Sequence, residues 1–205
     1  MKFTTEQEKF WSSDFGNSYL ERNKVKELLP NKINLFKEIL KSIEDIKSVI
    51  EYGPNTGVNL LALKSILSVV ELNAVEINSK AVSVLKKLDI CNKVIEDSMI
   101  NFKNEKKYDL SCTSGVLIHI NPDFLKKAYE TLYNSSKKYI LIIEYYNPTP
   151  VTIKYRGNIE KLYKRDFAGD IMKLFSDVKL LDYGFRYKKD NKFPLDDVTW
   201  FLLKK

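Results

Sequence analysis

An apolar run that ends in a glycine-bracketed turn constrains the fold of this chain more than any other stretch. Residues 49–52 read as a buried strand, residues 53–57 as a turn, and residues 58–67 carry leucines at helical spacing. A strand that enters a helix through such a turn leaves the first backbone N–H groups of the helix unpaired at the turn. The stretch therefore predicts a site for an anionic or strongly polar group, with an ordinary strand–turn–helix as the alternative.

Two glycines and an asparagine set the expected geometry of this turn. Gly53 permits a tight turn with close backbone approach, and Gly57 lets the start of the helix pack near the strand. Asn55 stands where many nucleotide-binding folds carry another glycine. Asparagine is one of the few other residues that tolerate a left-handed backbone, so we expect the turn to keep its shape.

The length of 205 residues predicts one domain over residues 1–205. Within it we expect a helical or lid-like segment at 1–30 and an insertion at 146–165. No apolar run approaches the roughly 20 residues that a membrane span needs, and the first residues lack a signal-peptide core. We therefore expect a cytoplasmic protein without a membrane partner. Cys91 and Cys112 lack metal-ligand spacing, which indicates reduced core residues and no metal.

The formal net charge of +7 allows phosphate-bearing partners but does not require them. Many lysines stand at exposed helical positions, such as Lys80, Lys86 and Lys87, which is the pattern of a solvated face.

Strand and helix patterns alternate along the rest of the chain. A helical pattern at 31–46 precedes strand patterns at 47–52, 72–77, 93–96, 108–113 and 138–145, which alternate with helical patterns at 57–67, 78–88, 122–134 and 165–175, before two final strands at 178–185 and 198–203. Such alternation predicts an α/β fold, a parallel sheet with helices on both faces. Ligands of these sheets bind at the carboxyl ends of the strands. The final two strands read as an antiparallel pair.

The ends of the predicted strands carry side chains suited to a nucleoside. Glu76 can accept both ribose hydroxyls. We expect Asp97 to accept an adenine amino group and the backbone of Ser98 to contact a ring nitrogen. Gly115 has no side chain to block close approach, so its main chain is expected to face the amino-acid part of a cofactor.

These motifs together resemble those of the class I S-adenosylmethionine-dependent methyltransferases. The matching motifs are Glu51-x-Gly53-x-Asn55-x-Gly57, Glu76, Asp97-Ser98 and residues 115–119. The resemblance implies a Rossmann-like, mainly parallel seven-stranded sheet with an antiparallel last strand. It also implies S-adenosyl-L-methionine as cofactor and S-adenosyl-L-homocysteine as product, with Glu51 among the cofactor-binding residues. An NAD-linked dehydrogenase is the competing Rossmann interpretation, but its fingerprint would require three glycines.

Further blocks at the two ends of the chain resemble the methylases called pseudaminic acid biosynthesis-associated. These blocks are Phe10-Trp11, Tyr19-x-x-Arg22-Asn23, residues 144–151, 155–157 and 164–169, and Asp196-Asp197-x-Thr199-Trp200. The resemblance implies a place in bacterial surface-glycan and capsule biosynthesis. It leaves the acceptor open among a sugar nucleotide, a phosphorylated sugar and a capsular phosphoramidate precursor.

Two side chains are candidates for the general base that an alcohol acceptor benefits from. His119, the only histidine, follows the fourth strand, and its alternative role is a helix-start histidine bonded to the backbone. Glu144 ends the fifth strand as a base or an acceptor-orienting carboxylate. Its alternative is a buried carboxylate satisfied by Arg156 or Arg165.

Segment 145–166 combines tyrosines, which stack on sugar faces, with arginines, which bind phosphates bidentately. The predicted acceptor residues are Tyr145, Tyr146, Asn147, Tyr155, Arg156 and Arg165, joined by Tyr19, Arg22 and Asn23 from the N-terminal segment. A solvated basic loop and an N-terminal helix packed on the flank of the sheet are the structural alternatives. Residues 147–150 resemble the Asn-Pro-Pro-aromatic motif of nucleobase amino-methylases, but they follow the fifth strand rather than the fourth, which excludes that interpretation.

The sequence therefore favours an O-methyltransferase that acts on a small phosphorylated or nucleotide-linked sugar, as a monomer or homodimer without nucleic acid. The alternatives are an RNA methyltransferase, motivated by the positive charge, and a cofactor-binding subunit that is active only with a partner protein.

Overall fold

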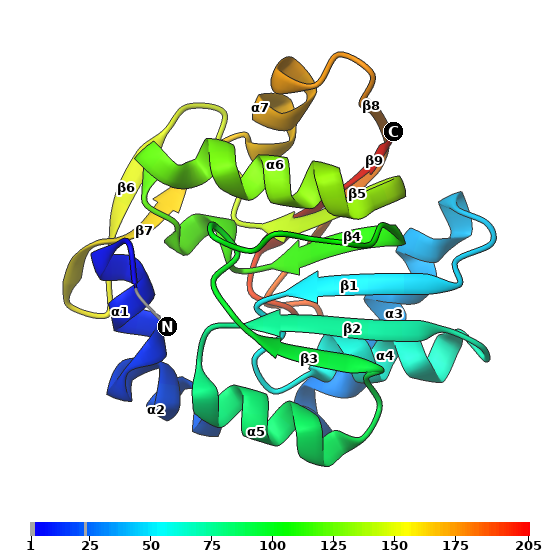
Figure 1. Ribbon diagram of the computed structural model, residues 1–205, viewed down its shortest axis with the longest axis horizontal. Helices are drawn as coiled ribbons and strands as arrows, with labels where there is room; N and C mark the ends of the chain where they lie inside the picture. Colours follow the sequence, from blue (N-terminus) through cyan, green and yellow to red (C-terminus); the bar gives the residue numbers. More distant parts are fainter. Residues whose placement is uncertain (1–2, 23) are drawn as a thin grey trace.

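A seven-stranded sheet in the order β3-β2-β1-β4-β5-β9-β8 forms the centre of the protein (Figure 1). The computed structural model describes residues 3–22 and 24–205. The strands are β1 Ser48–Tyr52, β2 Glu71–Glu76, β3 Lys93–Glu96, β4 Tyr108–Ser114, β5 Ser136–Glu144, β8 Lys179–Arg186 and β9 Val198–Lys204. Only β9 runs antiparallel to its neighbours, while the pairs from β3 to β5 are parallel. The expected sheet with its reversed last strand is confirmed.

Helices cover both faces of the sheet, because the central strands are buried on both sides and need cover there. On one face α3 Val25–Ile39, α4 Val58–Ile66 and α5 Ser79–Leu88 pack in one core. On the other face α6 Leu125–Ser135 and α7 Phe167–Leu174 pack in a second core. The expected two-faced cover is confirmed.

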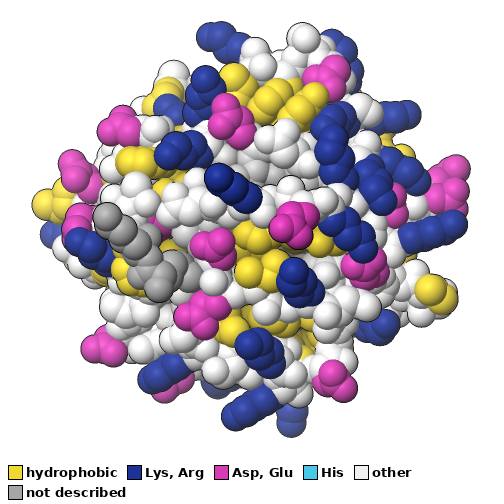
Figure 2. Space-filling model, viewed as in Figure 1, with side chains coloured by type: hydrophobic (Ala, Val, Ile, Leu, Met, Phe, Trp, Pro, Cys, Tyr) yellow, Lys and Arg dark blue, Asp and Glu magenta, His cyan; other side chains and the backbone are white. Residues whose placement is uncertain are grey.

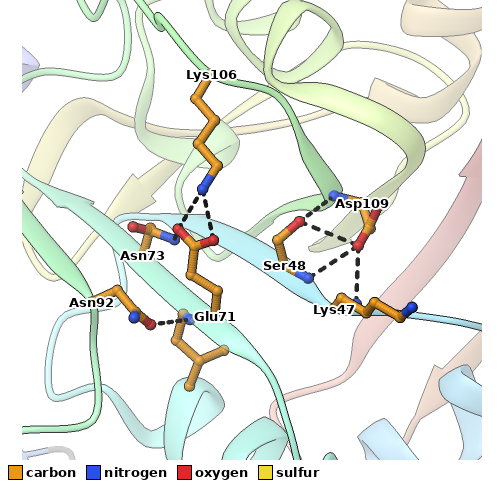
Figure 3. Close-up of polar contacts among 8 residues, drawn as sticks. Lys47, Ser48, Glu71, Asn73, Asn92, Lys106 and Asp109 are labelled. Carbon is orange, nitrogen blue, oxygen red and sulfur yellow. Dashed lines mark hydrogen bonds and ion pairs between the residues drawn. The ribbon is translucent and has the colours of Figure 1, made fainter.

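Polar contacts fix the strands at their amino ends, opposite the expected site (Figure 3). The Asp109 carboxylate accepts the N–H groups of Lys47 and Ser48 at 2.9 and 3.1 Å, which ties β4 to β1. Glu71 of β2 forms an ion pair with Lys106 at 2.6 Å. These contacts hold the strands in register, so that their carboxyl ends meet at one edge.

Two additions flank this edge. The first is the helix pair α1 Glu6–Ser12 and α2 Asp14–Arg22. The second is the hairpin of β6 Val151–Tyr155 and β7 Asn158–Lys164, which forms a separate antiparallel sheet. Figure 1 shows α1 beside this hairpin. The sequence located the insertion at 146–165 but did not predict its strands, because polar and charged residues interrupt the apolar alternation there.

Helix boundaries differ from prediction at two places. The helix predicted at 31–46 begins at Val25 and ends at Ile39, with Pro30 inside it. Proline removes only one helical hydrogen bond near a helix start, so α3 continues through it. The helix predicted from residue 122 opens with the 3-10 turn Pro122–Phe124 before α6.

Gly57 allows a test of the turn. Its φ is +76°, and an added Cβ would lie 2.8 Å from Leu85 and 2.9 Å from Leu88, both of α5 rather than the strand expected from the sequence. Gly157 also has positive φ, +86°, but an added Cβ there meets nothing within 4 Å. We predict that urea unfolding shows a loss for Gly57→Ala about 1 kcal/mol larger than for Gly157→Ala, because only the former also overpacks a core. Equal losses would contradict tight packing at Gly57.

Candidate functional site

A cavity of about 590 Å³ opens at the carboxyl ends of β1, β2, β4 and β5. Its volume is in the range of small-molecule sites. The predicted site residues that line it are Tyr19, Gly53, Asn55, Glu76, Asp97, Ser98, Gly115, His119, Glu144, Tyr145 and Tyr155. One cavity therefore brings together residues from all four of these strand ends and from both additions.

The turn after β1 has a left-handed backbone at all three alternating positions. The φ angles are +68° at Gly53, +51° at Asn55 and +76° at Gly57. Asn55 thus takes the conformation expected from the sequence. Gly53 and Asn55 face the cavity, whereas Gly57 packs against α5.

Glu76 holds this turn against the end of β2. Its side chain is 5% exposed, and its two oxygens accept the N–H groups of Asn55 and Asn78, each at 2.9 Å. Burial raises the pKa of Glu76, and the two N–H groups oppose that rise. Each carboxylate oxygen has a second lone pair for a ligand hydroxyl.

The residues after β3 differ in part from expectation. The Ser98 N–H donates to the side chain of Asp97 at 2.7 Å, so it is already engaged rather than directed at a ring nitrogen. The Ser98 hydroxyl donates to Glu8. Asp97 and Ser98 both line the cavity, but Ser98 also anchors α1.

Gly115 directly follows β4 with φ +68°, and an added Cβ would meet nothing within 4 Å. Since Gly115 lines the cavity, that open space is accessible to a ligand. The role of Gly115 in close approach to a cofactor stays a prediction.

Glu51 lies behind the cavity rather than in it. It is 1% exposed, and one of its oxygens accepts the Asn59 amide at 2.6 Å. Burial raises the pKa of Glu51 to about 7, against that hydrogen bond and the charge of Lys32. Asn59 lines the cavity, and its own oxygen has no hydrogen-bond partner among the described residues. Glu51 also has one buried oxygen, Oε2, without a partner among the described residues, but only Asn59 belongs to the cavity lining.

Glu144 anchors the segment that follows β4. It is 2% exposed, and Oε1 accepts the N–H groups of Val116 and Leu117, both at 3.0 Å. Oε2 has no hydrogen-bond partner within the part of the chain that the structure describes. Burial raises the pKa of Glu144 to about 7, although these N–H groups oppose the rise.

The alternative in which Arg156 or Arg165 satisfies a buried Glu144 does not hold. Arg165 pairs with Asp170 at 3.6 Å, and the Arg156 guanidinium lies 5.8 Å from the Tyr155 ring. The negative charge of Glu144 instead acts on Lys32 of α3, whose pKa it raises against the effect of burial.

Lys32 lines the cavity, and the sequence reading did not identify it. Burial lowers its pKa, while the carboxylates of Glu51, Asp196 and Glu144 oppose that change. A helical lysine far from the strand ends gave no signal in the sequence.

His119 is 8% exposed and lies in the 3-10 turn Leu117–His119. Its Nδ1 donates to the carbonyl of Lys161 in β7, which leaves Nε2 as the acceptor nitrogen. Burial lowers the pKa of His119 to about 4, so the ring is neutral at pH 7. The ring centre lies 4.5 Å from that of Trp11 and 5.0 Å from that of Tyr155.

The helix α1 closes one end of the cavity. The Glu8 carboxylate caps the start of α1 and accepts from Ser98, and the Gln7 amide donates to the Glu160 carbonyl at 3.0 Å and to Tyr163 at 3.2 Å. Gln7 and Trp11 line the cavity and were missed in the sequence reading as site residues. The sequence predicted a helical or lid-like segment at 1–30, but of these two residues only Trp11 belonged to a quoted sequence block.

Several predicted acceptor residues do not line the cavity: Arg22, Tyr146, Asn147, Arg156 and Arg165. Arg22 lies 5.3 Å from the Phe15 ring, and the Asn147 amide donates to the Thr149 carbonyl at 2.6 Å. Asn23 lies outside the described residues. Of the predicted acceptor residues that the structure describes, the three that line the cavity are all tyrosines, Tyr19, Tyr145 and Tyr155.

Of the helices described here, none combines the length and apolar character required to cross a membrane. Within residues 3–22 and 24–205, no group of three or more His, Cys, Asp or Glu side chains is placed to hold a metal ion. Independence from a metal stays a prediction.

No protein-family model matches the chain, and no curated protein matches it. Solved structures do match in fold. An S-adenosylmethionine-dependent methyltransferase from Leishmania major has a TM-score of 0.74 at 14% identity, over 97% of this chain and 82% of that one. One from Clostridium acetobutylicum has 0.63 at 12%, over 93% and 97%.

Magnesium protoporphyrin IX methyltransferase from Synechocystis PCC 6803, crystallised with S-adenosylmethionine, has a TM-score of 0.66 at 11% identity, and the match covers 100% of both chains. At these identities the likeness establishes the fold alone. The chain therefore has the class I S-adenosylmethionine-dependent methyltransferase fold.

The buried carboxyl of Glu144 predicts a pH-dependent stability. Its folded-state pKa of about 7 lies above the ordinary value of 4.5, so folding favours the protonated form. The contribution of the wild-type side chain is fully present below about pH 4.5 and is lost as pH rises toward 7. Glu144→Gln lacks this loss, so its stability relative to wild type should rise over that interval by up to about 3 kcal/mol.

Urea unfolding between pH 4 and pH 8 measures the difference. The matched control is Glu130→Gln on the exposed face of α6, which should show no such trend. A flat difference for Glu144→Gln would contradict a buried, unpaired carboxyl.

Proposed function

We propose that the protein is an S-adenosylmethionine-dependent O-methyltransferase whose acceptor is a small precursor of a bacterial surface glycan. The observation that carries the proposal is one cavity in which Glu76 and Asp97, suited to a nucleoside, share a wall with Gly115 and a neutral His119. The fold places that cavity where ligands of doubly wound sheets bind.

The cavity fits the cofactor in three respects. Glu76 retains acceptor capacity for ribose hydroxyls, the Asn59 oxygen lacks a partner within the described chain, and Gly115 leaves space for close approach. Lys32 and Lys188 both line the cavity, and we assign Lys32 to a ligand carboxylate. When bound, S-adenosylmethionine would supply a methyl group activated by a positively charged sulfur, and S-adenosylhomocysteine would leave once the methyl carbon had bonded to the acceptor oxygen.

His119 is the proposed general base. The Lys161 carbonyl fixes its tautomer and orientation, so Nε2 is free to take a proton from an acceptor hydroxyl. The packed rings of Trp11 and Tyr155 hold the imidazole in place and exclude water around it.

We assign Glu144 a positioning role. Its hydrogen bonds to Val116 and Leu117 fix the turn that carries His119. If Glu144 were the base instead, its pKa of about 7 would make the rate fall as the pH drops below 7. His119 as base would give no such fall.

The acceptor end of the cavity supports a ring-shaped substrate. Trp11, Tyr145 and Tyr155 offer flat surfaces, which pack on the apolar face of a sugar. The Gln7 carbonyl oxygen and the Trp11 N–H are buried without partners within the described chain, and we propose that an acceptor bound beside them pairs with one or both. Arg156, on the turn between β6 and β7, lies outside the lining and is available to a phosphate that extends from the cavity.

The finer assignment to surface-glycan or capsule biosynthesis rests on the resemblance of the terminal sequence blocks.

The acceptor role of Gln7 is tested by the variant Gln7→Met. An acceptor KM equal to that of the wild type would remove Gln7 from the proposed acceptor site.

A methyltransferase for RNA is the alternative that the net charge of +7 suggests. Figure 2 shows Lys and Arg side chains mixed with Asp and Glu over the visible face, without a continuous basic stripe. This mixture favours a small acceptor. Salt-sensitive retention of bulk RNA in a filter-binding assay would favour the alternative. A subunit that binds cofactor but turns over only with a partner protein is the second alternative.

Cofactor binding is tested by Glu76→Ala. Loss of the hydrogen bonds to two hydroxyls should weaken S-adenosylhomocysteine binding by about 100-fold or more in calorimetry. Glu96→Ala, at the end of the neighbouring β3 and in register with Glu76, is the matched control. Thermal unfolding checks that both variants fold. Equal affinity of both variants for S-adenosylhomocysteine would contradict the proposed role of Glu76 in cofactor binding.

His119 and Glu144 are distinguished by a pH profile. With His119 as base, kcat should stay level from pH 6 to pH 8, because the imidazole is already neutral above about pH 5. His119→Gln should lower kcat by roughly 10²–10⁴-fold with unchanged cofactor affinity. A wild-type kcat that falls below pH 7 would identify Glu144 as the base instead. The assay follows labelled methyl transfer to a panel of sugar nucleotides.

A further inference from the structure

An asparagine connects the donor side of the cavity to the N-terminal helices. Asn78 is 2% exposed, lines the cavity and immediately precedes α5. Its backbone N–H donates to Oε1 of Glu76 at 2.9 Å, and its side-chain oxygen caps α5 by accepting the N–H of Ala81 at 3.0 Å. The side-chain NH₂ group takes no part in this cap, so it can bond elsewhere.

The Asn78 NH₂ group bonds to both N-terminal helices. It donates to the backbone carbonyl of Trp11 in α1 at 3.1 Å and to the side-chain oxygen of Asn17 in α2 at 3.0 Å. We call these two hydrogen bonds the Asn78 latch. Figure 1 shows α2 beside the start of α5, where the latch lies. The latch therefore holds α1 and α2 next to the cavity wall that Glu76 forms.

Gly16 of α2 allows the close packing that the latch requires. An added Cβ would lie 1.8 Å from the Trp11 carbonyl oxygen and 2.9 Å from the Asn78 side-chain nitrogen, which are the two atoms of one latch bond. Glycine is the least favourable helix residue apart from proline, yet Gly16 lies within α2. Its presence there is explained by this close approach, since any side chain would part the two atoms.

The latch reaches the proposed base through Trp11. The Trp11 ring centre lies 4.5 Å from that of His119. The helices α1 and α2 have seven and nine residues, and helices so short are not stable by themselves in water. Their placement therefore depends on contacts with the rest of the chain, which include the latch and the hydrogen bond from Ser98 to Glu8.

We propose that Asn78 is a positioning residue, which couples the binding of the cofactor at Glu76 to the closed placement of α1 and α2 beside His119. The inference rests on the proposed function, in which Glu76 binds the cofactor ribose. A ligand hydroxyl bonded to Glu76 restricts the carboxylate, the carboxylate holds the Asn78 backbone, and the Asn78 side chain holds the two helices. A ligand that binds better when the latch is closed stabilises the closed placement, and the closed latch raises the affinity for the ligand by the same factor.

The variant Asn78→Ser separates the latch from the other roles of Asn78. Serine is about as good a helix cap as asparagine, and the backbone N–H that bonds to Glu76 is unchanged. The shorter serine side chain has no NH₂ group to donate to α1 and α2, so the latch is lost. Asn121→Ser is the matched control, because Asn121 caps a 3-10 turn through Asp123 outside the cavity lining. Asn17→Ala is a second, milder variant, which removes one latch acceptor and leaves the cap of α5 intact.

Amide hydrogen exchange, followed by mass spectrometry of peptides from α1 and α2, measures the latch without ligand. Asn78→Ser should exchange about 10-fold or more faster than wild type in these peptides, because two hydrogen bonds are lost. Asn17→Ala should show a smaller increase, and Asn121→Ser none. Peptides from β4, in the centre of the sheet, should exchange at the same rate in all four proteins, which checks that each folds. Wild-type exchange in both Asn78→Ser and Asn17→Ala would overturn the proposal.

The coupling is measured by the same exchange at saturating S-adenosylhomocysteine. In wild type the ligand should slow exchange in α1 and α2 by about fivefold or more. In Asn78→Ser, which calorimetry should show still binds the ligand, this ratio of free to bound rates should fall toward one. A purely structural Asn78 would change both rates by the same factor and leave the ratio unchanged, which would overturn the coupling alone. A wild-type chain that binds no S-adenosylhomocysteine would instead remove the proposed cofactor site and the coupling together.

Discussion

The carboxylate of Glu76 is the contact on which the donor side of the site depends. It joins the turn after β1 to the start of α5 by accepting the N–H groups of Asn55 and Asn78. With the carboxylate in place, the left-handed residues of the turn are held, and the cavity wall between β1 and β2 is fixed. A charged group that organises the backbone and also faces a ligand couples folding to binding.

The acceptor side is built differently, from segments far apart in the chain. Gln7 bonds to the hairpin at Glu160 and Tyr163, and His119 bonds to the hairpin at Lys161. Trp11 packs on His119 from the other side. The helix α1, the segment after β4 and the β6–β7 hairpin therefore form one unit, so that a change in any of them alters the space around His119.

Buried charges concentrate where this unit meets the sheet. Burial raises the pKa of Glu51 and of Glu144 to about 7 and lowers that of Lys32. Burial of charge costs stability, and a cluster of both signs offsets part of that cost. Titratable groups with shifted pKa values often cluster at functional sites, which agrees with the position of these three residues around the cavity.

The sequence by itself determined the α/β fold and brought the residues of the proposed donor site to one edge of the sheet. Alternating apolar runs specify a parallel sheet, and such a sheet brings Glu76, Asp97 and Gly115 to one edge, whatever the packing details. The tertiary structure alone decided the acceptor side. Gln7 and Lys32 line the cavity, whereas Arg165 lies outside the lining and pairs with Asp170. These positions depend on how distant segments of the chain pack. The alternation of strands and helices along the chain follows from local apolar patterns, whereas the direction of a long side chain depends on its neighbours in space.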